Sequence, residues 1–231
     1  MKLGFVSTQL TLAIGYLFAF SGAALAAPVP LTLDDFVVPA SPESKATFST
    51  STSVSPPAIS FNDALPTGNT FQNRTMTFNS FPSQTVPNSV CAALIGGGTM
   101  SVAQGTGALG DVYLAYGAWA TLPSGKPAPN LRLDMRDYTG LKFEFSGAED
   151  SLNINVQFYT STPIGSTKLY YSLSKVNVAS SSGGPQSFTL ALNKDPNFNW
   201  QWVDGVIVEI NVANDAPATS YTLNKLTFVD Q

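Results

Sequence analysis

Residues 137–160 have the sequence DYTGLKFEFSGAEDSLNINVQFYT, and this stretch decides the fold. Residues 141–145 alternate apolar and charged side chains, and residues 152–158 alternate apolar and amide side chains. A two-residue alternation puts successive side chains on opposite faces of a β-strand. Because a short polar segment with Gly147 separates the two runs, they predict a β-hairpin with one buried face. The polar face then carries Lys142, Glu144, Asn153, Asn155, Gln157 and Tyr159.

The rest of the chain continues in short segments of the same kind. Its 231 residues are 44% hydrophobic, which is enough for one sizeable core. Past the N-terminal segment no long 3.6-residue period occurs, and Gly, Pro and Asn turns separate about ten short strands. The sequence therefore predicts an all-β fold, an antiparallel jelly-roll β-sandwich. We expect a single domain over residues 27–231, with an irregular Ser/Thr/Pro-rich loop at about residues 39–57.

The first 26 residues have the pattern of a cleavable secretory signal peptide. Lys2 precedes a largely apolar run over residues 3–20, and Ala24 and Ala26 form the small-x-small cleavage pattern. We expect cleavage after Ala26, the alternative being a retained membrane anchor. No later run approaches the ~20 apolar residues that span a bilayer. The expected location is secreted, periplasmic or at the cell surface, with no membrane span after cleavage.

Composition removes several classes of function. The net charge is -4, and the eleven Lys and Arg residues are scattered, which argues against a nucleic-acid partner. Histidine is absent, so the commonest general base and metal ligand is missing. Cys91 is the only cysteine, has apolar neighbours, and is expected to be a buried thiol that forms no internal disulfide. No pattern in the sequence indicates an oligomeric state.

Several stretches resemble one family. Residues 137–145 resemble the entry to a strand of the galactose-binding-like jelly rolls, where a short turn and Gly precede an apolar strand. The stretches that resemble other strands of that family, in a consistent order, are residues 31–36, 188–190, 200–202, 206–210 and 223–228. Asn224 and Lys225 depart from the pattern, which has Asp-Asn there. The superfamily includes non-catalytic carbohydrate-binding modules and complex I intermediate-associated proteins, and the signal peptide favours the former.

Together with the signal peptide, this resemblance implies a secreted protein that binds a glycan and is not an enzyme. Sugar recognition needs flat aromatic surfaces for the ring faces and amides for the hydroxyl groups. The candidate ligand-binding residues are Asn153, Asn155, Gln157, Tyr159, Tyr113 and Trp119. The alternative is an ordinary solvated sheet face. Trp200 and Trp202 are either exposed stacking platforms or plugs over the sandwich edge, and burial favours the plug.

A structural Ca²⁺ ion is the one cofactor that the sequence suggests. Hard oxygen ligands are abundant, and similar jelly rolls often hold Ca²⁺ near the chain termini. Asp34, Asp35 and Asp230 are the candidate metal ligands, with solvated termini as the alternative.

Two other classes of function remain open. The Ser/Thr/Pro-rich loop and the low charge are compatible with a structural or adhesive surface protein that has no small ligand. A polysaccharide-active enzyme would need two converging carboxylates. The spacing of the Asp and Glu residues pairs no two of them, and the Gly-x-Ser-x-Gly nucleophile motif is absent.

Overall fold

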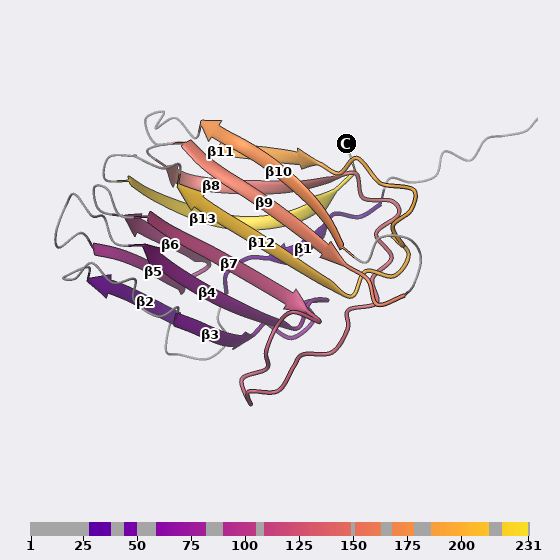
Figure 1. The fold of residues 1–231 in the computed structure, drawn as a ribbon, viewed down its shortest axis with the longest axis horizontal. Helices are drawn as coiled ribbons and strands as arrows, with labels where there is room; N and C mark the ends of the chain where they lie inside the picture. Colours follow the sequence, from indigo (N-terminus) through magenta and orange to yellow (C-terminus); the bar gives the residue numbers. More distant parts are fainter. Residues whose placement is uncertain are drawn as a thin grey trace, which may run out of the picture.

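The computed structural model describes residues 28–37, 44–49, 59–81, 90–104, 109–148, 151–162, 168–177, 186–212 and 219–230. The expected signal peptide lies outside these residues. Within them every regular element is a β-strand, so they include no helix that could cross a membrane. The strands form two stacked antiparallel sheets (Figure 1), which confirms the predicted all-β sandwich.

The larger sheet has seven strands. Its order is β11 (Gln186–Ala191), β8 (Gly140–Ala148), β13 (Thr219–Val229), β6 (Thr99–Gln104), β5 (Val90–Gly96) and β2 (Ser44–Ser49), with β1 (Leu31–Asp34) paired to β13. Cys91 lies in β5, and its side chain is outside those that the structure describes.

The second sheet has six strands and lies in front of the first in Figure 1. Its order is β10 (Lys168–Asn177), β9 (Ser151–Tyr159), β12 (Gly205–Val212), β7 (Leu109–Gly117), β4 (Asn73–Phe81) and β3 (Ile59–Ala64).

The core lies between the two sheets and follows the predicted alternation. The fully buried side chains of β8 and β9 are Leu141, Phe143, Phe145, Leu152, Ile154, Val156 and Phe158. All of them belong to one hydrophobic cluster. The predicted burial of Phe143 and Ile154 in a shared core is therefore confirmed.

The predicted hairpin of β8 and β9 is wrong. Strand β8 pairs with β11 and β13, whereas β9 pairs with β10 and β12 in the other sheet. The chain thus changes sheet between Ala148 and Ser151. Alternation predicts which face of a strand is buried but not its partner, and both apolar faces meet in the same core. Lys142 and Glu144 consequently lie on the opposite outer surface from Asn155.

Two edge strands were not predicted. Strand β2 lies inside the segment expected to be an irregular loop and pairs with β5, and β3 pairs with β4 at the edge of the other sheet. Both are at the lower edge of the sandwich in Figure 1. An edge strand bonds to one neighbour only, so a Ser- and Thr-containing segment without clear alternation can form it. The flanking residues 38–43 and 50–58 lie outside the described part.

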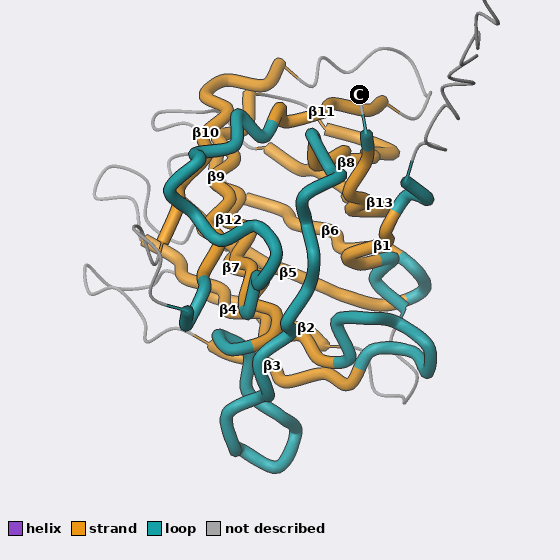
Figure 2. Tube along the Cα trace, turned by 90° about the vertical axis from the view of Figure 1, so that its right-hand side faces the viewer, coloured by secondary structure: helices purple, strands orange, loops and turns teal. Residues whose placement is uncertain are grey.

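Loops gather at one end of the sandwich, where residues 118–139 follow β7 (Figure 2). Gly117 lets this segment fold back onto the sheet. Its φ of 64° is in the left-handed region, and a Cβ there would come within 2.4 Å of the Asp204 carbonyl oxygen and 2.3 Å of Leu131 Cγ. Only glycine fits such a position without strain. Leu131 N donates to the same Asp204 oxygen at 3.0 Å, which holds the segment in place.

Candidate functional site

The outer face of the six-stranded sheet carries the predicted polar side chains of β9. Asn153, Asn155, Gln157 and Tyr159 are half-buried, whereas the residues between them are fully buried. The structure therefore places these four candidates along one strand, all on the side away from the core.

A hydrogen-bonded row crosses this face from β9 to β7. Glu209 of β12 lies opposite both Asn155 and Tyr113 in the strand register. Asn155 Nδ2 donates to Glu209 Oε2 at 3.1 Å, and the Tyr113 side chain is hydrogen-bonded to the same residue. Burial, and then the bond to Glu209, raise the pKa of Tyr113 above its ordinary value, so it stays a neutral phenol.

An aromatic pair lies at the end of the same face. The Trp119 and Tyr159 ring centroids are 5.4 Å apart, with an angle of 36° between the ring planes. Both side chains are half-buried, and Lys168 Nζ lies 6.0 Å from the Trp119 ring centroid. Gly205 is the β12 neighbour of Tyr159, and it pairs in turn with Gly117. No side chain therefore stands between Tyr159 and β7, which leaves room for the indole.

The fold thus brings all six candidate ligand-binding residues to one face. The sequence interpretation missed that Asp111, Asn211 and Glu209 belong to it as well. Asn211 lies opposite both Asn153 and Asp111 in the strand register. Glu209, two residues before it on β12, lies opposite Asn155 and Tyr113. The alternation of apolar and polar residues in 206–212 was the available signal, because it places Glu209 and Asn211 on the side facing away from Val208 and Ile210.

Two carboxylates give this face an unusual electrostatic feature. Burial, and then the negative charge of Glu209, raise the pKa of Asp111 to about 6. Among the described residues no Lys or Arg forms an ion pair with either carboxylate. Asp111 is therefore half-protonated in mildly acidic solution.

We expect Asp111→Asn to stabilise the protein at pH 7.5 and to have little effect at pH 4. A carboxyl group whose pKa is higher in the folded state binds more protons there than in the unfolded state. The free energy of unfolding consequently falls as the pH rises from about 4 to about 6. Because Asp111 is partly exposed, we expect a gain of about 1 kcal/mol or less above pH 7.

Thermal melts of the wild type and of Asp111→Asn across pH 4–8 measure this difference. Glu209→Gln is the matched control. It should remove the smaller part of the pH dependence, because burial is the main cause of the Asp111 shift. If the melting temperatures of the wild type and of Asp111→Asn changed with pH in the same way, the raised pKa of Asp111 would be contradicted.

The two tryptophans near residue 200 differ in their environment. Trp200 is only 6% exposed, packs against Phe158 and Phe198 at 5.3 and 4.9 Å between centroids, and donates from Nε1 to the Asp195 carbonyl oxygen at 3.1 Å. It is the expected plug. Trp202 is 37% exposed, and the Arg132 guanidinium lies 5.6 Å from its ring centroid. The predicted plug role is therefore wrong for Trp202, which offers an accessible aromatic surface at the end of the sandwich.

The three candidate calcium ligands have protein partners. Asp34 is fully buried and accepts hydrogen bonds from Arg74, Tyr116 and the backbone of Phe36. Asp35 accepts from Val37 N at 3.4 Å, and Asp230 accepts from Thr139 Oγ1 at 3.3 Å. Across the described part of the chain, no three Cys, Asp or Glu residues gather where they could hold a metal ion. Asp34 is thus an internal ion-pair partner, and calcium binding stays a prediction.

Fold and site together define a class: an antiparallel β-sandwich with a polar and aromatic outer face on one sheet. No protein-family model matches the chain, and no curated protein matches it.

Solved structures similar to this chain include carbohydrate-binding modules. One is the family 30 module of the cellulosomal cellulase Cel9D-Cel44B of Clostridium thermocellum, at 14% identity and a TM-score of 0.37, covering 80% of this chain and 98% of that chain. Another is the family 11 module of the cellulosomal cellulase Lic26A-Cel5E of the same organism, at 10% identity and a TM-score of 0.36. The match covers 89% of this chain and 97% of that chain. A third comes from work on the structural basis for the promiscuous specificity of carbohydrate-binding modules from the β-sandwich superfamily, and it has 14% identity and a TM-score of 0.32. The match covers 73% of this chain and 55% of that chain.

Proposed function

We propose that this is a secreted, non-catalytic protein that binds a neutral glycan chain across the outer face of its six-stranded sheet. The observation that carries the proposal is the pairing of the Trp119 and Tyr159 rings at 5.4 Å on the face that also holds the Asn155–Glu209–Tyr113 row. Secretion rests on the signal-peptide pattern of residues 1–26.

The side chains of this face suit the two surfaces of a sugar ring. Aromatic rings pack against the C–H faces, and amides and carboxylates both orient and bind the hydroxyl groups. Tyr159, Gln157, Asn155 and Asn153 lie at every second residue of β9, so a glycan laid along the strand would meet a ring first and amides afterwards. Asp111 and Glu209 would repel an anionic polysaccharide, which favours a neutral one.

Binding to a panel of neutral polysaccharides tests the proposal. In affinity electrophoresis and calorimetry with the mature chain, we expect Tyr159→Ala and Trp119→Ala to bind at least tenfold more weakly, because lost ring contacts cost about 1.5 kcal/mol each. Asn155→Ala should also weaken binding, since it removes the donor to Glu209.

Two controls locate the ligand. Thr189→Ala alters an exposed residue of β11 in the other sheet and should bind like the wild type. Trp202→Ala removes an exposed ring at the end of the sandwich. If Trp202→Ala abolishes binding while Tyr159→Ala and Asn155→Ala bind as well as the wild type, the proposed face is wrong.

Polysaccharide cleavage is the second candidate function. The observation that favours it is the Asp111 and Glu209 pair, in which one carboxyl group has its pKa raised to about 6, as a general acid requires. Release of reducing ends from the same polysaccharides at pH 5–6, abolished by Asp111→Asn, would move the protein to this class. Binding without product release keeps it among the non-catalytic modules.

A further inference from the structure

Asp204, which immediately precedes β12, is completely buried and has no cationic partner. Among the described residues no Lys or Arg forms an ion pair with it. Its Oδ1 atom is shielded from solvent and makes no hydrogen bond within the described part of the chain. Burying a carboxylate without a counter-ion is costly, and buried polar atoms without a partner are rare in native structures. The other oxygen and the backbone of Asp204 indicate what offsets this cost.

The carboxylate fixes the point where the chain leaves β9. Asp204 Oδ2 accepts from Ser161 N at 2.7 Å and from Ser161 Oγ at 2.6 Å. Asp204 N donates to the carbonyl oxygen of Tyr159, two residues earlier, at 2.8 Å, and Thr160 between them is fully buried. Hydrogen bonds to a charged acceptor are shorter and stronger than neutral ones. Asp204 therefore holds the backbone on both sides of Thr160, directly after the Tyr159 ring.

The backbone of the same residue holds the turn that carries the second ring. Ala120 N donates to the Gly117 carbonyl oxygen at 2.8 Å, which closes a four-residue turn with Trp119 in its third position. Ala118 N, inside this turn, donates to the Asp204 carbonyl oxygen at 2.9 Å. Asp204 is thus bonded to both segments from which the paired rings project.

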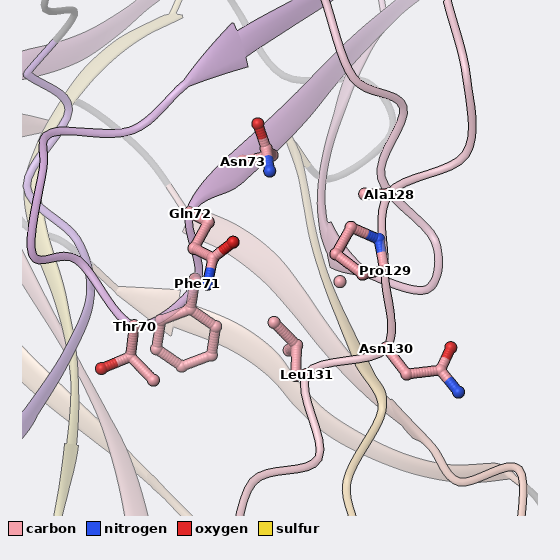
Figure 3. A pocket seen from close by; sticks show the side chains of 9 residues that line it. Thr70, Phe71, Gln72, Asn73, Ala128, Pro129, Asn130 and Leu131 are labelled. Atoms are coloured by element: carbon pink, nitrogen blue, oxygen red, sulfur yellow. The ribbon is translucent and has the colours of Figure 1, made fainter.

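The far end of the loop that follows this turn is held at the same place. Leu131 N donates to the Asp204 carbonyl oxygen at 3.0 Å. Leu131 and Phe71 line a small recess between residues 128–131 and 70–73 (Figure 3). Its cavity measures about 30 Å³, room for about one water molecule. The loop is therefore closely packed there, and the turn with Trp119 is fixed at both ends.

We propose that Asp204 is a positioning residue, whose carboxylate fixes the end of β9 and so holds the Tyr159 ring against Trp119. It contacts no ligand itself and acts through Ser161 and the backbone of Tyr159. Its effect on glycan binding rests on the proposed function of the sheet face. Its effect on the two rings does not, because their contact is measurable without any glycan.

NMR of the ¹⁵N-labelled mature protein tests the contact. The indole N–H signals of the three tryptophans are assigned by replacing each with phenylalanine, and NOEs between the Trp119 and Tyr159 ring protons report the pair. We expect Asp204→Ala to lose these NOEs and to shift the Trp119 indole signal, because Ser161 loses its acceptor. Asp204→Asn keeps an acceptor oxygen without the charge, so its NOEs should be intermediate.

Affinity and stability should change in opposite directions. With xyloglucan, galactomannan and β-glucan as probes, we expect Asp204→Ala to weaken binding about tenfold, because the ring must be ordered on binding. Asp204→Asn should weaken it about threefold. Asp204→Asn should nevertheless melt at the wild-type temperature or higher, because it removes a buried charge without a counter-ion. A residue with a purely structural role would lower both together.

Two further variants keep the test decisive. Asp34→Asn also alters a buried aspartate and should lower the melting temperature, yet keep the NOEs and the affinity. Ser161→Ala removes one donor to Asp204 from an exposed residue, so it serves if Asp204→Ala does not fold. It should weaken the NOEs, whereas Ser187→Ala, an exposed serine of β11, should not.

The outcomes separate this role from the glycan site. Unchanged ring NOEs in Asp204→Ala, or in Ser161→Ala where the former is unfolded, would overturn the positioning role. Loss of the NOEs in Asp34→Asn would also overturn it, because the contact would then follow overall stability. If the wild type binds no polysaccharide while Asp204→Ala loses the NOEs, the proposed function fails and the positioning role stands. Undiminished polysaccharide binding after the NOEs are lost would remove the role of Asp204 in binding.

Discussion

Replacing Asp34 with alanine is expected to cost about 3–5 kcal/mol of folding free energy, because it leaves Arg74 buried without its main counter-ion. Arg74 and Asp34 are both fully buried, and Arg74 Nη1 donates to the two Asp34 oxygens at 2.9 and 2.8 Å. Tyr116 donates to Asp34 at 2.7 Å, and so does the backbone N–H of Phe36. A domain has only about 5–15 kcal/mol in total, so this loss approaches complete unfolding.

The same network joins the two sheets. Asp34 ends β1 of the seven-stranded sheet, whereas Arg74 and Tyr116 belong to β4 and β7 of the other. Asp63 of β3 accepts from Arg74 Nη2 at 2.9 Å. Burial alone would lower the pKa of Arg74, but the charge of Asp34 and the bonds to both carboxylates raise it above its ordinary value. The guanidinium therefore stays charged, and removing Asp34 leaves it with its bond to Asp63 but without its main, fully buried partner.

Urea unfolding monitored by circular dichroism measures this effect. Asp34→Asn keeps an acceptor oxygen but loses the charge, so its free energy of unfolding should lie between those of the wild type and of Asp34→Ala. Asp134→Ala is the control, since its exposed ion pair with Arg136 should contribute about 1 kcal/mol or less. The double variant Asp34→Leu/Arg74→Met should be more stable than Asp34→Ala alone. A change below 1 kcal/mol in Asp34→Ala would mean that the buried ion pair does not exist in solution.

Phe143→Ala is expected to cost a similar amount, about 3–5 kcal/mol, because it leaves a cavity between the sheets. Phe143 is fully buried in the middle of β8, with Phe188 of β11 and Leu226 of β13 opposite it in the register. Its cost has a different physical origin from that of Asp34, namely lost packing and lost burial of apolar surface. In a domain of this size such a loss lowers the melting temperature by roughly 10 °C, or prevents secretion.

Gln157→Ala is the paired measurement for Phe143→Ala. Gln157 lies on the outer face of β9, half-buried, and its truncation should change stability by about 0.5 kcal/mol or less. Thermal melts of the two variants therefore report which face of each strand meets the core. If Gln157→Ala were the more damaging, the faces would be inverted, and the proposed binding face would be excluded with them.

What residues 137–160 determined by themselves was the face that each side chain occupies. The alternation in 141–145 and 152–158 depends only on the two-residue geometry of an extended chain. It therefore predicted correctly that Phe143 and Ile154 are buried. For the same reason Asn155 and Tyr159 could be assigned to one outer face before any partner strand was known. The gain on burying a large ring predicted the plug role correctly for Trp200 but not for Trp202, which is exposed.

What only the tertiary structure decided was which strands are neighbours. Strands β8 and β9 are separated by two residues in the chain and lie in different sheets, whereas Glu209 is 54 residues from its hydrogen-bond partner Asn155. Arg74 likewise meets Asp34 across 40 residues. Sheets are joined by backbone hydrogen bonds, whose donors and acceptors are the same in nearly every residue. Strand partners are therefore chosen by the packing of the whole chain around one core, which no local pattern encodes.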